Sequence, residues 1–572
     1  MKKTVTILVI LILAVSVAAL SGCGQGDVDL AVRYKKAGDD LIVKMEAAHD
    51  DVETAEYHVS ESYSAVVGQQ QPGDNTLYPK FESEVKSVLS LLDSAKAEYE
   101  KILALDGVED YKAYAKEMLE CLQGANAWIE SDMAMTSKMN EVITQFAQTG
   151  NAPDLAVEIN TDREKGISFT EQSAGHYDAA YQIDKDKIHD TVPEDGRTPE
   201  HAHVSWREDP VKGVIVEWET GKWLKGYGAN VKYGTASDNL SQTAKGPSFL
   251  YQYSDVEGHQ ATLSTTRPDT QYFYRCGSDG YGWSDVLSFR TSPAVGDGFT
   301  FCVTGDTRSA SPKTSDVTEW GKVATAASTA KPLFTIINGD LVFLGFEDQL
   351  WPAWLDAAKP LMDSSVIMPC LGNHESYARG FFDRFVLPGN ERWYSYDISD
   401  AHFICLDTGL MNYAEGPLLD EQVKWLTSDL ERAKERGSRW TVVYTHRSPY
   451  SSGNLPDQPD IIASWVPIFD RFGVDLVIPS HVHYYERSFP MKGGQVVASS
   501  PSQYESPGGT IYMITGGGGV PLGDPVPAPW IASLAREFCY AVVEVPGRTG
   551  NTLKVQTKTP DGRVLDSFTV SK

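Results

Sequence analysis

The stretch Phe299-Thr300-Phe301-Cys302-Val303-Thr304-Gly305-Asp306 sets the pattern of the C-terminal half of the chain. An apolar run of β-forming residues ends in Gly-Asp, and the same order returns in residues 333–340, which end in Gly339-Asp340. A third run, residues 366–370, leads into Gly372-Asn373-His374-Glu375. Short apolar runs bounded by turn residues are typical of buried strands. The sequence therefore predicts strands that each end in polar residues.

Two further runs extend this pattern towards the C-terminus. Residues 440–444 lead to His446, and residues 474–478 lead to His481-Val482-His483. Because a layered sheet places its strand ends at one edge, we expect these separated side chains to converge. Helical stretches lie between the runs, and the clearest of them is capped by Gly437 and has an apolar face of Val423, Leu426, Leu430 and Ala433. This alternation predicts an α/β domain over residues 298–572.

The polar residues at the strand ends supply carboxylate, amide and imidazole groups. This mixture of oxygen and nitrogen ligands suits Fe, Zn or Mn better than calcium. The scattered cysteines show no CxxC or Cys/His spacing, which excludes a structural zinc site of that kind. The predicted metal ligands are Asp306, Asp340, Asn373, His446, His481 and His483.

Taken together, the strand ends resemble the five sequence blocks of the calcineurin-like metallophosphoesterases. The blocks are Gly305-Asp306, Gly339-Asp340-Leu341-Val342-Phe343-Leu344-Gly345, Gly372-Asn373-His374-Glu375, His446 and His481-Val482-His483-Tyr484-Tyr485-Glu486-Arg487. The Tyr-Glu-Arg of the last block is similar to that of the purple acid phosphatases. The resemblance covers residues 199–572 and implies a four-layer α/β/β/α fold.

The resemblance also implies a dinuclear metal centre, in which Asp340 bridges two divalent or trivalent ions. The first ion is bound by Asp306 and His483, and the second by Asn373, His446 and His481. By the same resemblance, His374 contacts phosphate and helps to protonate the leaving oxygen. Two cations about 3.5 to 4 Å apart can bind a phosphate and lower the pKa of a bridging water.

These roles predict a hydrolase that attacks a small-molecule phosphate ester with a metal-bound hydroxide. The favoured function is that of a phosphomonoesterase similar to acid phosphatases. One alternative is a phosphodiesterase or nucleotidase on the same scaffold. Another, of a different class, is a surface-binding lipoprotein whose metal site has decayed, but all six expected ligands are present in the sequence.

The sequence departs from the purple acid phosphatase pattern at two positions. Phe343 stands where those enzymes carry a tyrosine ligand, so a purple enzyme is not expected. The first block continues as Asp306-Thr307-Arg308 instead of Asp-x-His. Arg308 cannot serve as a metal ligand, but it can grip phosphate as a fork of donors or pair with a nearby carboxylate. The further histidines that plant enzymes carry shortly after this block are absent from residues 447–464, which leaves Tyr450 as a candidate for the substrate pocket.

The first residues predict export and lipid anchoring. Lys2 and Lys3 precede an apolar run over residues 5–20, which is typical of a signal peptide. Leu20-Ser21-Gly22-Cys23 resembles the bacterial lipobox, so residues 1–22 are expected to be removed and Cys23 to carry the lipid. The alternative is an ordinary signal peptide with a chance cysteine. We expect an extracytoplasmic lipoprotein that is anchored to a bacterial membrane.

Two further domains lie between the anchor and the α/β domain. Residues 23–191 predict a helical bundle or stalk, because apolar residues recur at helical spacing from Phe81 to Ile102 and again from Tyr114 to Ile129. The sequence does not identify a partner for this bundle. Residues 199–293 alternate with period two and predict a β-sandwich. Their segment Pro268 to Gly277 resembles the fibronectin-type domain that precedes the catalytic domain of purple acid phosphatases.

Length and charge agree with several domains and exclude one class of partner. A chain of 572 residues exceeds a single core, and 41% hydrophobic and 22% charged residues are typical of folded proteins. With 50 Lys and Arg against 78 Asp and Glu, the net charge is −28, so nucleic acid is not expected as a partner.

Overall fold

A computed structural model of the chain describes residues 2–69, 72–188, 198–221, 224, 227–251, 256–264, 267–311, 313–409, 420–453 and 457–572. For residues 2–25 and a few other helical positions, the description is limited to the backbone. The chain forms two compact units, one over residues 1–66, 71–192 and 223–226, and the other over residues 67–70, 193–222 and 227–572.

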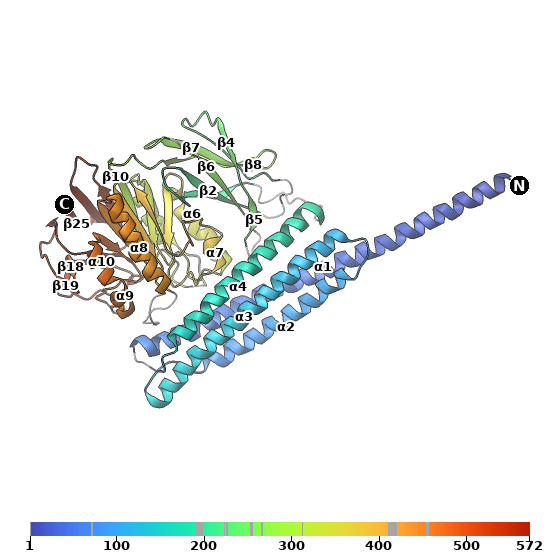
Figure 1. Cartoon of the computed structure of the whole chain (residues 1–572), viewed down its shortest axis with the longest axis horizontal. Coiled ribbons are helices and arrows are strands. Elements are labelled where there is room, and N and C mark those ends of the chain that lie inside the picture. Colours follow the sequence, from blue (N-terminus) through green and yellow to red (C-terminus); the bar gives the residue numbers. More distant parts are fainter. Residues whose placement is uncertain are drawn as a thin grey trace. The chain divides into compact units, whose positions relative to one another are not determined.

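The first unit consists of long helices that run alongside one another (Figure 1). These are α1 (Lys2–Gln69), α2 (Leu77–Leu103), α3 (Glu109–Thr149) and α4 (Ala156–Ile183), which continues into a π-helical turn (Asp184–Ile188). The predicted stripe from Phe81 to Ile102 is buried throughout, as is the stripe from Tyr114 to Ile129. Both stripes belong to one apolar core, so the helical prediction is confirmed for this region.

Residues 2–25 form the beginning of α1, but the side chain of Cys23 lies outside the description. Within the residues that were described, no helix combines the length and the apolar character that crossing a membrane requires. The six cysteines after Cys23 are all buried, as expected for small apolar side chains (Cys121, Cys276, Cys302, Cys370, Cys405 and Cys539).

The second unit begins with a β-rich region made of two antiparallel sheets. One has the order β1-β2-β6-β5: Glu200–Ser205, Gly213–Gly221, Val256–Ser264 and Ser248–Leu250. The other has the order β4-β3-β7-β8, with β9 also on β7: Gln242–Lys245, Asn230–Gly234, Gln271–Ser278, Gly282–Trp283 and Leu287–Arg290. Trp218 on the first sheet and Tyr274 on the second are fully buried, in agreement with the period-two pattern.

Two seven-stranded sheets form the rest of this unit. The first has the order β12-β11-β10-β23-β24-β25-β20: Val366–Cys370, Phe334–Asn338, Phe299–Thr304, Tyr540–Val545, Thr552–Lys558, Val564–Ser571 and Gln503–Glu505. The second has the order β13-β14-β15-β16-β21-β17-β22: Tyr394–Ile398, Ala401–Leu406, Trp440–Thr445, Leu476–Ile478, Ile511–Thr515, Tyr485–Ser488 and Ile531–Ala535. A short hairpin, β18 (Met491–Lys492) and β19 (Gln495–Val496), lies between β17 and β20 in the sequence.

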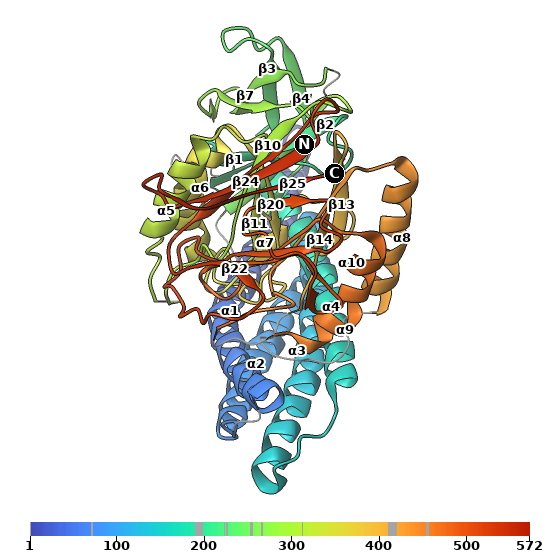
Figure 2. The same cartoon turned by 90° about the vertical axis from the view of Figure 1, so that its left-hand side faces the viewer.

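Helices cover the outer faces of the two sheets. In Figure 2, α5 (Thr318–Ser328) and α6 (Trp351–Met362) lie on one side of the strands, and α8 (Asp420–Arg436), α9 (Pro459–Ser464) and α10 (Val466–Phe472) lie on the other. The helix α5 contacts β23 and α6 contacts β12. The helices α8, α9 and α10 share an apolar core with β14, β15 and β16. Two short helices, 3₁₀ (Asp348–Leu350) and α7 (Arg379–Phe382), complete this region.

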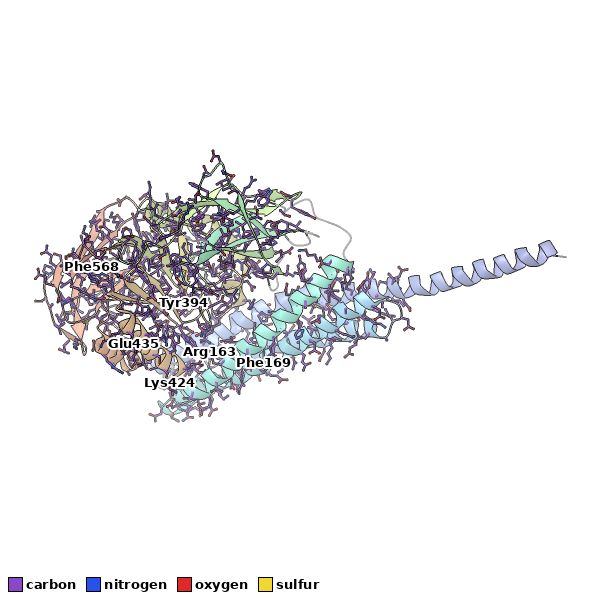
Figure 3. The ribbon with its side chains drawn as sticks, turned by 45° about the horizontal axis from the view of Figure 1, so that its top comes forward. Arg163, Phe169, Tyr394, Lys424, Glu435 and Phe568 are labelled. Atoms are coloured by element: carbon purple, nitrogen blue, oxygen red, sulfur yellow. The ribbon has the colours of Figure 1, made fainter. Side chains whose placement is uncertain are left out.

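The helix α8 has the face and the cap that its sequence predicts. Leu426, Leu430 and Ala433 are buried, whereas Lys424 and Glu435, labelled in Figure 3, belong to the same helix outside that face. Gly437 has φ of 79°, and its N–H donates to the carbonyl of Lys434 at 3.0 Å. The N–H of Ser438 donates to the carbonyl of Ala433 at 3.0 Å, which completes a Schellman motif.

The strand-end pattern alone suggested a single sheet edge, whereas the four-layer fold implied by the resemblance has two sheets, and the structure has two. The strands β10, β11 and β12 belong to the first sheet, and β15 and β16 belong to the second. The sheets pack face to face, with Phe301 of β10 edge-on to Phe403 of β14 at a ring separation of 5.2 Å. The hydroxyl of Tyr394 (Figure 3) donates across the sheets to the carbonyl of Pro369 at 2.6 Å. The polar strand ends therefore meet across two sheets.

Contacts with the β-rich region fix the segment after strand β12 that includes Arg384 and Val386. Arg384 lies with its Nε 3.0 Å from Glu219 of β2, and its guanidinium is fully buried. The N–H of Val386 donates to Glu217 at 2.6 Å, and the carbonyl of Val386 accepts from Ser205 at 2.7 Å. These contacts fix the course of the chain shortly after Asn373 and His374.

Candidate metal centre

All six predicted metal ligands lie together in the second unit. They form two clusters that share Asp340, one with His446 and His481 and the other with Asp306 and His483. Within each cluster, the ligand atoms lie within 4.8 Å of one another. Asn373 joins the first of these clusters through its amide oxygen, which lies 3.0 Å from Nε2 of His446. A carboxylate common to two groups of ligands is the arrangement that a pair of metal ions requires.

Four of these ligands have an unusual backbone conformation. Asp306, Asp340, His481 and His483 have φ of 58°, 54°, 74° and 56°, which is the left-handed region. Non-glycine residues occupy this region rarely, and such positions cost about 1–3 kcal/mol each. Backbone hydrogen bonds hold them in place; for example, the N–H of Asp306 donates to the carbonyl of Gly339 at 3.1 Å. Strain of this kind is concentrated at functional sites.

Around His446, acceptor atoms of neighbouring side chains lie close to one another. Nδ1 of His446 donates to the carbonyl of Asn338 at 2.8 Å, which leaves Nε2 without a proton in the neutral ring. That Nε2 lies 3.1 Å from Nδ1 of His481 and 3.2 Å from Oδ1 of Asp340. A carbonyl partner of this type orients metal-binding histidines. Lone pairs that converge in this way fit a cation.

Two buried atoms in the site lack a hydrogen-bond partner among the described residues. They are Oδ1 of Asp306, which lies 3.6 Å from Nε2 of His483, and Nε2 of His481. The other oxygen of Asp306 accepts the N–H of His481 at 2.7 Å. A buried polar atom without a partner costs about 1–3 kcal/mol. Because both atoms belong to the ligand set, the residues present fit a bound metal.

Electrostatics in the site agree with this interpretation. Burial, and then the neighbouring charge of Asp340, raise the pKa of Asp306 well above its ordinary value. Burial, and then the charge of Arg308, lower the pKa of His483 to about 3 and that of His374 to about 4. Neutral imidazoles are the form that binds metal. A cation between the two carboxylates would relieve their mutual repulsion.

His374 lies beside the two clusters but outside them. Its N–H donates to Oδ1 of Asp340 at 3.1 Å, and its Nδ1 donates to the carbonyl of Phe343 at 2.6 Å. Nε2 lies 3.8 Å from Oδ2 of Asp340. The ring is therefore fixed with Nε2 towards the metal ligands, where it can exchange a proton with a bound molecule.

Arg308 and Tyr450 occupy different surroundings. Arg308 lies at the ligands, with Nε 3.4 Å from Oδ2 of Asp340. Tyr450 packs in the apolar core under α8, with its ring 5.0 Å from that of Tyr512 and 6.2 Å from that of Trp530. The structure thus brings Arg308 into the site, whereas the pocket role of Tyr450 stays a prediction.

Glu375 shapes the site, although sequence reasoning gave it no role. Its carboxylate accepts the N–H groups of Gly372 at 2.7 Å, Asp340 at 2.9 Å and Leu341 at 2.7 Å. Burial, and then the charge of Asp340, raise the pKa of Glu375 to about 8, and these N–H groups oppose the shift. Its place in the block after Asn373 and His374 was the only signal in the sequence.

Gly516, in the glycine run that follows β21, lies close to the metal ligands. A Cβ at this position would lie 2.7 Å from Oδ2 of Asp306 and 2.9 Å from the backbone nitrogen of His483. No real Cβ tolerates such contacts, so a larger residue would displace both ligands.

Comparisons with known proteins agree with this geometry. Residues 199–291 match the family model for the purple acid phosphatase N-terminal domain, and residues 299–485 match that for calcineurin-like phosphoesterases. The chain is 29% identical over 416 residues to acid phosphatase type 7 of Mus musculus, which covers 65% of this chain and 91% of that protein. It is 27% identical over 342 residues to purple acid phosphatase 18 of Arabidopsis thaliana, which covers 56% of this chain and 71% of that protein.

A solved structure extends the likeness to the fold. The purple acid phosphatase from yellow lupin (Lupinus luteus) seeds aligns with a TM-score of 0.57 at 19% identity, over 65% of this chain and 74% of that chain. The second unit thus contains a purple acid phosphatase N-terminal domain followed by a calcineurin-like phosphoesterase domain, and it has the fold of a metallophosphoesterase with a dinuclear centre. The protein is a hydrolase of phosphoric esters.

Proposed function

We propose that the protein is a phosphomonoesterase that depends on two metal ions bound around Asp340. The observation that carries this proposal is that Asp340 belongs to both ligand clusters. Asp306 and His483 would hold one ion, and Asn373, His446 and His481 would hold the other. The donor set of carboxylate, amide and imidazole groups suits Fe, Zn or Mn. The acid phosphatases among its relatives support the choice of a phosphate monoester as substrate.

The residues of the chain would act around that centre. Two bound cations supply Lewis acidity and a water of lowered pKa. The carbonyl of Phe343 holds the His374 ring so that Nε2 faces the substrate, and a proton on Nε2 can pass to the departing ester oxygen. Because burial and Arg308 lower the pKa of His374 to about 4, this proton is retained best at acid pH or beside an anionic substrate. We therefore expect hydrolysis to weaken as the pH rises.

The deciding experiment is hydrolysis of p-nitrophenyl phosphate and bis(p-nitrophenyl) phosphate by the metal-loaded full chain. Asp340→Asn should abolish metal binding and activity, and His374→Ala should lower kcat by about 100- to 10,000-fold with the metal retained. Asp269→Asn is the matched control, since Asp269 is an exposed carboxylate paired with Arg290. Activity that survives Asp340→Asn would show that the site lies elsewhere. A preference for the diester would favour a phosphodiesterase.

We also propose that the protein is exported and lipid-anchored through Cys23. Support comes from Lys2 and Lys3, the apolar run after them and the lipobox-like residues 20–23. Two acyl signals are needed to hold a protein stably at a membrane surface. Cell fractionation should place the native chain with membranes and Cys23→Ala in the soluble fraction. An unprocessed N-terminus on the membrane-bound native chain, seen by mass spectrometry, would contradict the proposal.

The limits of the domains remain part of the proposal. We place the helical bundle at residues 23–191, the β-rich domain at 199–293 and the catalytic domain at 298–572. The two antiparallel sheets of the β-rich domain support its assignment as a fibronectin-type sandwich. Limited proteolysis of the full chain should yield fragments whose ends fall between these domains, and first cuts inside a domain would contradict the limits.

A further inference from the structure

Arg308 lies at the metal ligands without being bound tightly to any of them. Its side chain is about nine-tenths buried, and its Nε lies 3.4 Å from Oδ2 of Asp340. Hydrogen bonds between charged groups are usually about 2.7–2.9 Å long. Elsewhere in this unit Arg392 reaches Asp407 at 2.9 Å and Arg290 reaches Asp269 at 2.6 Å. The pair of Arg308 and Asp340 is therefore looser than the structural ion pairs of the same chain.

The guanidinium is held in place by stacking. Its central carbon lies 4.8 Å from the ring centroid of Phe343, within the range of a cation–π contact. Nη1 donates to the carbonyl of Ser309 at 3.1 Å, and Nη2 has no hydrogen-bond partner among the residues described. Contact with the face of the ring restrains the guanidinium without using its N–H groups, which leaves Nη2 available to a ligand.

The same phenylalanine also positions His374. The ring centroids of Phe343 and His374 are 4.8 Å apart, and the carbonyl of Phe343 fixes Nδ1 of His374. Nε of Arg308 and Nε2 of His374 both approach Oδ2 of Asp340, at 3.4 and 3.8 Å, whereas Oδ1 faces His446. Two side-chain nitrogens thus share one side of the bridging carboxylate, the side that a substrate must approach to meet His374.

Charge indicates what this side would bind. The carboxylates of Asp306 and Asp340 cannot neutralise two divalent cations, and Arg308 adds a further positive charge. An anion with more than one negative charge balances this excess best. A phosphomonoester has three unesterified oxygens and up to two negative charges, whereas a phosphodiester has two such oxygens and one charge. The third oxygen of a monoester has no counterpart in a diester.

We propose that Arg308, stacked on Phe343, binds an unesterified phosphate oxygen and makes the site prefer phosphomonoesters to phosphodiesters. This inference rests on the proposed function. Arg308 acts as a substrate-binding residue, and Phe343 acts as a positioning residue for both Arg308 and His374. The phenylalanine that stands in place of a tyrosine ligand thereby serves the substrate instead of the metal.

The test compares the two chromogenic esters with metal-loaded full-length variants. A hydrogen bond to a charged group contributes enough that Arg308→Ala should lower kcat/KM for the monoester by about 10- to 100-fold, but by less than about 3-fold for the diester. Arg308→Lys should fall between, since it keeps the charge without the planar fork. Arg471→Ala is the matched control, because Arg471 is exposed and also lies 4.8 Å from a phenylalanine ring.

Phe343→Leu tests the positioning role. It should raise KM for the monoester and weaken inhibition by inorganic phosphate by about 3- to 10-fold, with the metal content unchanged. It should add little to Arg308→Ala, because the guanidinium that it positions is then absent. Full additivity of the two changes in the phosphate inhibition constant would overturn the stacking argument.

Direct binding of inorganic phosphate separates this inference from the proposed function. Calorimetry on the metal-loaded chain should show phosphate affinity at least about 10-fold lower in Arg308→Ala than in the native chain. Equal losses on both esters, loss of metal from Arg308→Ala, or unchanged phosphate affinity would each overturn the inference. If the native chain hydrolyses neither ester, the proposed function fails, and the phosphate measurement alone then decides the role of Arg308.

Discussion

Replacement of His402 by asparagine should destabilise the catalytic domain in a manner that depends on pH. His402 on β14 is fully buried, and its two ring nitrogens lie 2.8 Å from Asp397 on β13 and 2.8 Å from Asp429 on α8. Burial alone would lower the pKa of His402, but the hydrogen bonds to Asp397 and Asp429 outweigh it and raise the pKa. The charged ring thus holds α8 to the second sheet.

The magnitude follows from the partners that would remain. Removal of one partner of a buried ion pair costs about 3–5 kcal/mol. Asp429 keeps Ser395 at 2.9 Å and Arg432 at 3.0 Å, and Asp397 keeps Arg436 at 2.9 Å, so the lower end of about 3 kcal/mol is expected. For a domain of this size that corresponds to a fall in Tm of about 6–12 °C.

The sign of the pH dependence is fixed by the direction of the shift. A histidine with a raised pKa contributes its full stability below the ordinary value of about 6.5 and loses it as the pH rises through the folded-state pKa. The pKa values of Asp397 and Asp429 are lowered: burial opposes this, but the contacts with His402 prevail. Their contribution is present above about 3.9 and is lost as the pH falls through their folded-state values. The difference between native and variant chains should therefore be largest near pH 5–6 and smaller at pH 9.

Calorimetric Tm values of the native chain and His402→Asn at pH 5.5 and pH 9 test this reasoning. His176→Asn is the control. His176 pairs with Glu117 at 2.8 Å, but both side chains are more than one-third exposed, at 43% and 34%. Exposed pairs contribute about 0–1 kcal/mol. A Tm difference for His402→Asn that stays constant or grows from pH 5.5 to pH 9 would refute the charged-ring argument.

Three further predictions concern the metal centre. Glu375→Gln should weaken metal affinity by about 10- to 100-fold, because a glutamine cannot accept all the N–H groups that shape the loops of Asp340 and Gly372. Metal titration measures this affinity, and an unchanged value would contradict the prediction. Gly516→Ala should displace Asp306 and reduce the bound metal measured by elemental analysis, whereas Gly175→Ala, with open space around its Cβ, should not. Retention of both ions in Gly516→Ala would contradict the close approach. Chelation of the metal should abolish activity and lower Tm by several degrees, because a ligand that binds only the folded chain stabilises it. A Tm that does not change on addition of chelator would show that no tightly bound metal is present.

Sequence reasoning succeeded where the determinants are local. The buried stripe of α2 from Phe81 to Ile102 and the capped face of α8 follow from periodicity and from one glycine, Gly437. The metal ligands were recognisable for the same reason, since each polar residue directly follows its own strand. Their convergence was predicted correctly, although by way of one sheet edge instead of two.

What the sequence could not supply depends on contacts between distant segments. The division of the strands into two sheets is a matter of non-local pairing: no residue near Asp306 or His446 encodes it, and only the resemblance to a four-layer fold implied it. Glu375 shapes the site through backbone groups that any residue type provides, so its partners are invisible in the sequence. Tyr450 follows His446 closely, but nothing local specifies that its ring packs under α8.

The left-handed backbone at Asp306, Asp340, His481 and His483 also constrains how this centre can change. Aspartate, asparagine and histidine are the non-glycine residues that most readily adopt such a conformation. The residue types that coordinate here are thus also the ones that the main chain accepts. Cysteine or glutamate, which could alter the choice of metal, would be opposed at these four positions by the backbone as well as by coordination chemistry. Evolution or engineering of a new metal preference would therefore be easier at Asn373 and His446, or by remodelling whole loops.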